Sequence, residues 1–446
     1  MSSSRVLIRG GRLVTSDRLI DGDLLIEDGV ISQVGGAAEA AASDEIVDAN
    51  GLYVLPGFVD LHVHGGCGFS VTAGLFDPER RRFDARVERY RERLPQLAAH
   101  FARHGVTYAL ATTWGDRIDR LKRALGLLAE YALGERNGLD GCRLGGAFLE
   151  GTFIKDARFA GAQNPENFRE PSAALFDEIN DAARGIVRYV NVTPEFGDSA
   201  LSLIEELDGR GTLVGAGHSG CTAEEFHCAV EHGLRIAIHL TNGPTGNSFK
   251  TFNGGGMLEG VLTSPVFAEL IVDGYHVNPA YVLDIVRRKG ADKICVISDA
   301  MFAAGAEGIE EFEIGGTRGA LSADGKYVGV VGKPNTLFSS VLTMDVGFAN
   351  VLNWLTAGGE GVWNAEHPPL AFEAALLTAS RFASANPAKA LRLYEPESAV
   401  AALERQDCIG SLEIGKRADV TMLKIEGEPG AYGVDVKSVL VAGRPV

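Results

Sequence analysis

Short apolar runs alternate with longer amphipathic stretches through the middle of this chain. This alternation predicts buried parallel strands joined by crossover helices, which is an α/β arrangement. At least seven such units in about 320 residues favour a TIM-like (β/α)8 barrel, whose usual size is about 250 residues before insertions. A doubly wound open sheet is the alternative, but no Gly-x-Gly-x-x-Gly turn follows the first strand. The expected strands include residues 108–112, 144–149, 213–217, 236–240, 269–273 and 293–298.

The two ends of the chain have a different texture, with short β-type runs separated by glycine and aspartate turns. Because both ends share this pattern, we expect residues 1–55 and 405–446 to form one small β-sandwich domain. Residues 56–404 would then form the barrel together with its C-terminal helices. The runs that carry this prediction are residues 5–9, 11–15, 23–27, 419–424 and 436–441.

The charge balance and the cysteine pattern exclude several classes of partner. The chain has 42 basic and 59 acidic residues, a formal net charge of −17, whereas an extended nucleic-acid surface needs clustered lysine and arginine. No run approaches the roughly 20 apolar residues of a membrane span, and the start lacks the apolar core of a secretory signal. The six cysteines are scattered and form no Cys-x-x-Cys pair, so the sequence indicates neither a disulfide framework nor a thiolate zinc site. We therefore expect a cytoplasmic protein that acts on a small molecule, without a nucleic-acid or membrane partner.

Histidine and carboxylate residues stand at the ends of the expected strands. The carboxyl ends of barrel strands meet at one face, where (β/α)8 enzymes build their active sites. His62 and His64 are two residues apart on a strand, so both side chains point the same way and can share a metal ion. This mixed donor set suits Zn²⁺ best, with Fe²⁺, Mn²⁺ and Co²⁺ as alternatives. The expected metal ligands are His62, His64, Glu150, His218, His239 and Asp299.

A metal ion of this kind activates water and polarises a carbonyl oxygen, which is hydrolytic chemistry. A nearby carboxylate has to take the proton from the water and pass it to the leaving group. Asp299, at the end of the last expected strand, is our candidate for this base. The competing interpretation of Asp299 is the N-cap of a helix that begins at Ala300.

Short motifs surround these residues through most of the chain. They occupy residues 56–64, 148–151, 193–195, 217–219, 238–243, 272–276, 298–300, 385–388 and 410–419. In these motifs the chain resembles the amidohydrolase superfamily and, within it, the N-acetylglucosamine-6-phosphate deacetylases. The Leu-Glu-Gly, Gly-His-Ser and Asp-Gly-x-His motifs are the discriminating ones, whereas the tail motif at 410–419 is shared by much of the superfamily.

The resemblance implies roles for the strand-end residues. Glu150, His218 and His239 would hold the principal metal ion, and Asp299 would be the general base and then the general acid of amide hydrolysis. Some family members keep a His-x-His pair after the first strand and bind two ions, whereas others have lost it and bind one. Because this chain keeps the pair, the resemblance implies a second ion, with Glu150 as the bridge between the two.

The resemblance also implies how the substrate is held. His276 would polarise the acetyl carbonyl opposite the metal, and Asn242 and Gly243 match the stretch that holds the distal end of the substrate. Gln163 takes the place of a substrate-contacting histidine found in many relatives. No arginine lies between Asn242 and His276, where the deacetylases place a phosphate-binding arginine, and Lys250 would substitute as a point charge. The family further implies a homodimer.

A basic segment over residues 78–93 is another departure from the family pattern. An apolar series at i, i+3 and i, i+4 from Phe83 to Phe101 predicts a helix, and the Glu–Arg spacing predicts that its charged face is solvated. The alternative is that one of the arginines at positions 80–82 reaches a phosphate of the substrate in its own or a neighbouring subunit.

The sequence therefore predicts a metal-dependent hydrolase that removes the acetyl group of an N-acetylated amino sugar, with N-acetylglucosamine-6-phosphate as the leading substrate. A first alternative is an amidohydrolase of another amide, such as an N-acyl-D-amino acid, a cyclic amide or a non-phosphorylated acetamido sugar. A second alternative is a catalytically idle barrel that serves as a binding protein. The presence of every expected ligand and of the base argues against the second alternative.

Overall fold

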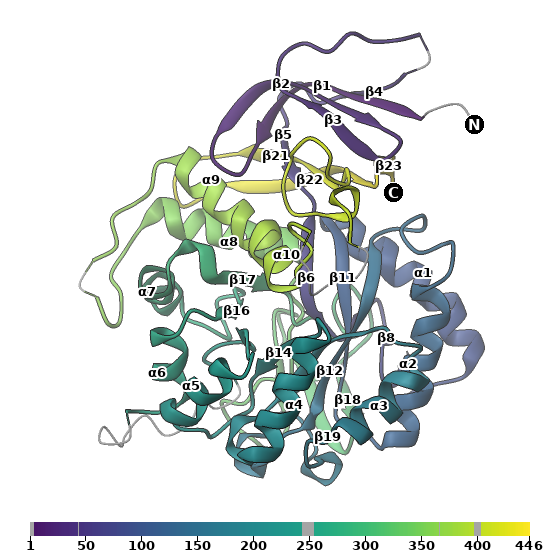
Figure 1. Ribbon diagram of the computed structural model, residues 1–446, viewed down its shortest axis with the longest axis vertical. Coiled ribbons are helices and arrows are strands. Elements are labelled where there is room, and N and C mark those ends of the chain that lie inside the picture. The colour runs from purple at the N-terminus through teal and green to yellow at the C-terminus, as the bar shows by residue number, and fades with distance from the viewer. Residues whose placement is uncertain (1–3, 43, 243–253, 365, 397–402) are drawn as a thin grey trace.

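The computed structural model describes residues 4–42, 44–242, 254–364, 366–396 and 403–446. Its centre is a parallel sheet of eight strands in the order β17-β16-β15-β14-β13-β12-β11-β6 (Figure 1). The ends of this sheet meet, because the Asp299 amide donates to the His62 carbonyl at 2.9 Å and Val63 bridges to Ala300. The strands are β6 (Phe58–Val63), β11 (Val106–Thr113), β12 (Arg143–Phe153), β13 (Val187–Val192), β14 (Leu213–Ala216), β15 (Ile236–Ala237), β16 (Phe267–Ile271) and β17 (Ile294–Ile297). The predicted (β/α)8 barrel is confirmed.

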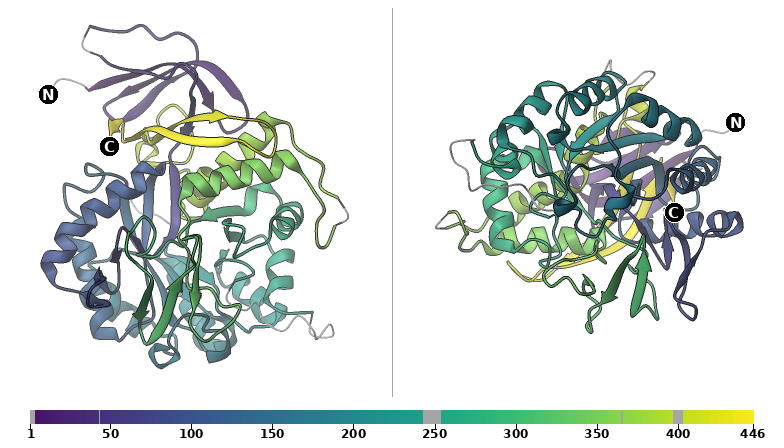
Figure 2. Two further views of the ribbon diagram at one scale, coloured as in Figure 1. Left: turned by 180° about the vertical axis from the view of Figure 1, so that it is seen from behind. Right: turned by 90° about the horizontal axis from the view of Figure 1, so that it is seen from below.

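The helices cover the outside of the barrel (Figure 2). Each turns an apolar stripe inward; α2, for example, buries Leu121, Leu125 and Leu128, which recur at helical spacing. The barrel strands are buried on both faces, the inner one towards the barrel interior and the outer one against the helices. In β11, for example, every position is buried. The helices are α1 (Val87–Arg103), α2 (Ile118–Ala132), α3 (Ala173–Ala182), α4 (Asp198–Gly209), α5 (Ala223–Glu231), α6 (Met257–Thr263), α7 (Pro279–Lys289), α8 (Met344–Ala357), α9 (Phe372–Ser380) and α10 (Asn386–Ala390).

Two details differ from the sequence prediction. The helix expected from Phe83 begins at Val87, because residues 82–84 form strand β10 (Arg82–Asp84) and Phe83 packs against the rings of Phe76 and Phe302. Strand β10 belongs to a four-stranded sheet with β7 (Gly65–Gly66), β8 (Phe69–Ser70) and β9 (Gly74–Asp77). Strand β13 was not among the expected strands, because Arg188 and Asn191 interrupt its apolar run.

The two ends of the chain share one further sheet of eight strands, in the order β23-β22-β21-β5-β1-β2-β3 with β4 paired to β1. A core of its own fills the space between its two halves; Ile8 and Leu24 come from one half, and Met422 and Leu440 from the other. The strands are β1 (Arg5–Val14), β2 (Leu19–Glu27), β3 (Val30–Val34), β4 (Glu45–Asp48), β5 (Tyr53–Pro56), β21 (Val420–Glu426), β22 (Gly433–Val441) and β23 (Arg444–Pro445). The domain boundaries at residues 55 and 405 stay a prediction.

An insertion after β17 lies at the opposite end of the barrel from this shared sheet (Figure 1). It contains a three-stranded antiparallel sheet of β18 (Glu311–Ile314), β19 (Thr317–Leu321) and β20 (Val328–Val330). Phe302, Phe312 and Phe338 pack beneath it together with Trp114. The insertion therefore stands over the carboxyl ends of the barrel strands, where the expected site residues lie. No helix within the described residues is long and apolar enough to cross a membrane.

Candidate metal centre and active-site pocket

The six expected metal ligands converge at the carboxyl end of the barrel. They form two groups of three, and within each group the ligand atoms lie within 4.8 Å of one another. Every one of these residues is at most 7% exposed. One group is His62, His64 and Asp299, from β6 and the end of β17; the other is Glu150, His218 and His239, from β12 and the ends of β14 and β15.

Glu150 holds the second group together and faces the first. Its Oε1 lies 3.2 Å from His218 Nε2 and 3.1 Å from His239 Nε2, while these two nitrogens are 3.2 Å apart. Its Oε2 lies 3.6 Å from His64 Nε2. The carboxylate therefore stands between the two groups, where a ligand shared by two ions would have to be.

Asp299 has the corresponding place in the first group. Its Oδ1 lies 3.3 Å from His64 Nε2 and 3.5 Å from His62 Nε2, and these two imidazole nitrogens are 3.2 Å apart. Two nitrogens bound to one tetrahedral Zn²⁺ at about 2.0–2.1 Å would lie about 3.3 Å apart. The spacing of both histidine pairs thus fits a shared ion.

Hydrogen bonds to the outer ring nitrogens orient the histidines. His218 Nδ1 donates to the carbonyl of Phe159, and His239 Nδ1 donates to the carbonyl of Asn242, both at 2.9 Å. Because a carbonyl oxygen can only accept, each ring must carry its proton on Nδ1. A neutral ring of this tautomer has its lone pair on Nε2, which faces the site, and this is the form that binds a metal.

Glu269, in the middle of β16, is a buried carboxylate that the sequence analysis did not single out. Its Oε2 accepts from His62 Nδ1 at 3.1 Å and from the backbone amide of His239 at 3.2 Å, while its Oε1 accepts from the Tyr189 hydroxyl at 3.0 Å. The side chain is fully buried. A charged residue inside an otherwise apolar strand was the available signal, since such a residue is rarely buried without a partner.

Three of the six residues have left-handed backbone conformations. The φ angles are 55° at His218, 29° at His239 and 49° at Asp299. A residue with a side chain adopts this region at a cost of the order of 1–3 kcal/mol, and such strain gathers at functional sites. Each of these residues lies two positions after the end of its strand, β14, β15 or β17, where the backbone turns.

The charges at the site support the binding of a cation. Burial alone would raise the pKa of Asp299, but the charge of His62, together with the hydrogen bond and charge of His64 and the charge of His239, outweighs burial and lowers that pKa to about 2. Burial also opposes ionisation of Glu150, yet hydrogen bonds from His218 and His239 hold its pKa well below the ordinary value. The pKa of His62 is raised to about 10 by the surrounding carboxylates, Asp299 foremost, against the effect of burial. The site therefore retains anionic carboxylates and attracts positive charge.

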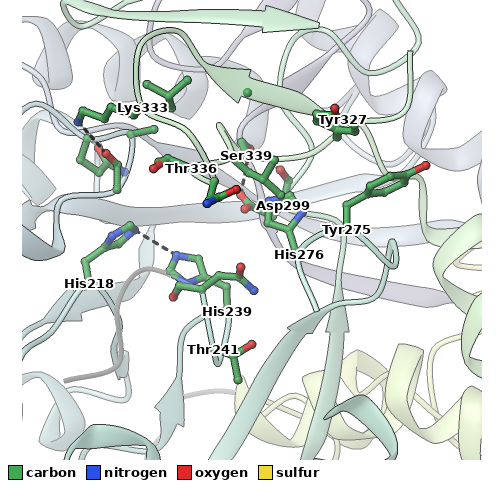
Figure 3. A pocket seen from close by; sticks show the side chains of 18 of the residues that line it. His218, His239, Thr241, Tyr275, His276, Asp299, Tyr327, Lys333, Thr336 and Ser339 are labelled. Carbon is green, nitrogen blue, oxygen red and sulfur yellow. Dashed lines mark hydrogen bonds between the residues drawn. The ribbon is translucent and has the colours of Figure 1, made fainter. Parts of the chain in front are cut away.

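His276 is fixed by a carboxylate three residues earlier in the chain. Asp273 accepts from His276 Nδ1 at 2.7 Å and from the His276 backbone amide at 2.8 Å. The His276 ring lines the same pocket as Asp299 and His239 (Figure 3). Its Nε2 is left for a group bound in the pocket.

Comparison with known proteins places this geometry in a family. The profile of the amidohydrolase family matches residues 53–446. This chain belongs to the amidohydrolase family. The resemblance stated from the motifs and the predicted enzyme class, a hydrolase, are thereby confirmed, and this family is metal-dependent.

Individual relatives narrow the comparison. The chain is 28% identical to the N-acetylglucosamine-6-phosphate deacetylase of Vibrio furnissii over 82% of this chain and 78% of the relative. It is also 28% identical to the N-acetylgalactosamine-6-phosphate deacetylase of Escherichia coli O157:H7 over 98% of both chains. A solved structure of a mutant N-acetyl-D-glucosamine-6-phosphate deacetylase from Mycobacterium smegmatis, in complex with N-acetyl-D-glucosamine-6-phosphate, matches 99% of both chains at 26% identity with a TM-score of 0.77.

In this amidohydrolase, Gln163 is in contact with Glu150, one of the expected metal ligands. Its Nε2 donates to Glu150 Oε2 at 2.6 Å, and its Oε1 accepts from the Gly115 amide at 2.8 Å. Both ends of the amide are thus engaged within the protein, although Gln163 also lines the pocket. Its expected contact with substrate stays a prediction.

Of the remaining substrate-binding predictions, the structure places Asn242 at the pocket. Asn242 lines it, and its buried Nδ2 has no partner among the described residues. Gly243 and Lys250 lie outside the described residues. The arginines at positions 80–82 are not part of the pocket lining; Arg80 pairs with Asp77 at 3.0 Å, and Arg81 lies 3.9 Å from Glu311.

The pocket above the two groups has a volume of about 1180 Å³. Its floor carries Asp299, whose Oδ1 lies 3.1 Å from Ser339 Oγ, a hydroxyl that also contacts the Asp299 backbone carbonyl. No helix begins at Ala300, where the chain bridges to Val63, so the interpretation of Asp299 as a helix N-cap is wrong. The carboxylate is therefore directed at the site.

Proposed function

We propose that this amidohydrolase removes the acetyl group of an N-acetylated hexosamine 6-phosphate, with N-acetylglucosamine-6-phosphate as the leading substrate. The products would be glucosamine-6-phosphate and acetate. The observation that carries the proposal is that residues of both ligand groups, Asp299 among them, line one pocket together with His276, whose ring Asp273 holds. Relatives named for this reaction support it.

The donor set fits divalent metal ions, and we propose Zn²⁺. Glu150, His218 and His239 would hold the principal ion, and His62, His64 and Asp299 would hold a second ion, with Glu150 between them. Bound there, zinc would activate water and polarise the acetyl carbonyl. The two 3.2 Å nitrogen separations and the outward Nδ1 hydrogen bonds support this assignment.

Two side chains would handle the charge and the proton. His276 would donate a hydrogen bond from Nε2 to the acetyl oxygen as negative charge develops there, with Asp273 stabilising the doubly protonated ring. Asp299 would take a proton from the attacking water and deliver it to the leaving nitrogen, as base and then acid. The hydrogen bond from Ser339 would keep the Asp299 carboxylate in place between these two steps.

The 4-epimer of the sugar is a second candidate. The relative named N-acetylgalactosamine-6-phosphate deacetylase aligns with this chain over nearly the full length of both. The two substrates differ only in the configuration of one hydroxyl group, so the same floor would serve either one. Contacts at the mouth of the pocket would decide between them.

The test is acetate release from four substrates: N-acetylglucosamine and N-acetylgalactosamine, each with and without the 6-phosphate. We expect one phosphorylated sugar to exceed its neutral counterpart in kcat/KM by at least about tenfold. Equal turnover of the neutral sugar would favour the alternative of a non-phosphorylated acetamido sugar. Hydrolysis only of an N-acyl-D-amino acid or a cyclic amide would overturn the proposal.

We also propose a cytoplasmic homodimer, in line with the resemblance. A sedimentation equilibrium measurement on the purified chain tests the dimer, since a single species of monomer mass would contradict it.

A further inference from the structure

Two cationic side chains line the pocket among the described residues, Arg158 and Lys333. The Arg158 guanidinium is already engaged, because its Nε lies 3.1 Å and 2.9 Å from the two carboxylate oxygens of Asp156. Its side chain is also 75% exposed. Arg158 therefore brings no uncompensated charge to the pocket.

Lys333 differs from Arg158 in having no ion pair within the described residues. Its Nζ donates only a long hydrogen bond, 3.4 Å, to the carbonyl of Gly161. An ammonium group has three donors, so most of its capacity is unused. In a protein with a net charge of −17, a lysine without a counterion at the rim of a deep pocket is a candidate for binding an anion.

The residues that follow Lys333 present further donors to the same pocket. Asn335 and Thr336 both line it, and neither side chain makes a hydrogen bond within the described part of the chain. The turn that places them has Asn335 in a left-handed conformation, φ 61°, and a backbone hydrogen bond from Thr336 to Lys333. One turn thus offers an ammonium, an amide and a hydroxyl together.

This turn lies close to the metal centre on both sides. Gly161, which accepts from Lys333, is so near His218 that a Cβ on it would lie 3.2 Å from His218 Cε1. Three residues beyond Thr336, Ser339 hydrogen-bonds to Asp299. Figure 3 shows Lys333 and Thr336 on the same wall of the pocket as Ser339, beside the histidines.

We propose that Lys333, Asn335 and Thr336 bind the phosphate ester of the substrate. This inference rests on the proposed function, whose substrate is a hexosamine phosphate bound by its acetamide at the metal centre. Lys333 supplies the point charge, and the amide and hydroxyl supply directed hydrogen bonds to the phosphate oxygens. The turn takes over the task that an arginine between positions 242 and 276 would otherwise have.

The experiment compares Lys333→Met with the wild type in equilibrium binding, using the metal-loaded enzyme and two amino sugars, the proposed product glucosamine-6-phosphate and its unphosphorylated analogue glucosamine. We expect Lys333→Met to weaken binding of the phosphorylated sugar by about tenfold and to leave glucosamine unchanged. Lys333→Arg should retain at least half of the phosphate preference, because it keeps the charge. Arg158→Met is the matched control, and its affinity should stay within about twofold of the wild type.

Lys333 is exposed, so its replacement is not expected to disturb folding, and a thermal unfolding midpoint checks this. The proposal is overturned if Lys333→Met binds both sugars as the wild type does, or if Lys250→Met alone removes the phosphate preference. The proposed function fails separately, if the wild type binds the phosphorylated sugar but releases no acetate from its N-acetyl derivative. If instead the wild type releases acetate and Lys333→Met binds glucosamine-6-phosphate as tightly as the wild type does, the proposed function stands and the proposed phosphate site is wrong.

Discussion

At the floor of the pocket, three of the four histidines have a hydrogen-bond partner behind the ring, and Asp299 is held by Ser339. At the mouth, the polar side chains of residues 333–336 are exposed or partly exposed, and those of Asn335 and Thr336 make no hydrogen bond within the described residues. The floor is therefore preorganised before a substrate arrives, whereas the mouth has donors to spare.

This difference separates two tasks. A preorganised set of charges lowers the barrier of the reaction because nothing has to rearrange as charge develops. Unused donors on a turn cost little in the free protein and contribute only when a matching ligand is present. Substitutions at the floor should consequently change kcat, and substitutions at the mouth should change the choice of substrate.

The largest effect is expected from Asp299→Asn. Removing the proposed general base should lower kcat by about 10³-fold, because the amide cannot carry a proton from water to the leaving nitrogen. Ser339→Ala is the matched control, and it should cost only about tenfold because the carboxylate remains. Acetate release and metal content are measured together. Turnover near that of the wild type with the metal content unchanged would show that Asp299 is not the base.

Asp273→Asn should lower kcat by about 10²-fold, since an amide stabilises the protonated His276 ring less well than a carboxylate does. A double-mutant cycle sharpens this prediction: in a His276→Asn background, Asp273→Asn should cost almost nothing further. Steady-state kinetics of the four enzymes give the coupling. Additive losses would mean that Asp273 acts independently of His276.

Glu269→Gln should act on the metal and through it on the rate. Losing the charge behind His62 should weaken retention of the metal ion in the first group by about tenfold, as replacements of outer partners commonly do. Metal per chain is measured after dialysis against graded chelator. Tyr189→Phe, which removes a single hydrogen bond to the same carboxylate, should have the smaller effect. Equal metal retention in Glu269→Gln and wild type would contradict a role for Glu269 in metal binding.

The smallest effect is expected from Arg82→Ala and Arg80→Ala. Neither residue lines the pocket, and Arg80 is paired with Asp77, so kcat/KM for the phosphorylated sugar should stay within about twofold of the wild type. A tenfold loss in either variant would revive the hypothesis that the segment at residues 80–82 reaches a phosphate. Such a loss would also mean that residues outside 333–336 contribute to binding at the mouth of the pocket.

The floor could be predicted from the sequence for a physical reason. Histidine and carboxylate residues directly after buried apolar runs are rare unless they serve a site, and the barrel brings all strand ends to one face. This placed His62, Glu150 and Asp299 together although they are far apart in the chain. The contacts behind the ligands were not predictable in this way, because Glu269 is at a position inside a strand that could equally well face a helix.

The mouth was predicted less well, because loops carry no periodic signal. The sequence directed attention to Gln163 as a substrate contact; the structure shows it bound to Glu150 and lining the pocket, so the substrate contact stays a prediction. Lys333 drew no notice, since a lysine in a Gly- and Pro-containing turn is ordinary on the surface. Only the folding of the insertion over the pocket gives this residue a place near His218.

The shared sheet has a consequence for how the chain is made. Strand β5 pairs with β1 on one side and with β21 on the other. Leu55 can therefore pair with Thr421 only after residue 421 has been synthesised. On the ribosome, the first fifty-odd residues emerge long before β21, so the backbone N–H and C=O groups along one edge of β5 stay unpaired while the barrel is synthesised. The barrel therefore has to fold while the shared sheet is incomplete. Synthesis of β21 and β22 then completes that sheet. A nascent chain halted before residue 420 should remain susceptible to proteolysis at β1–β5, and one released after residue 441 should not.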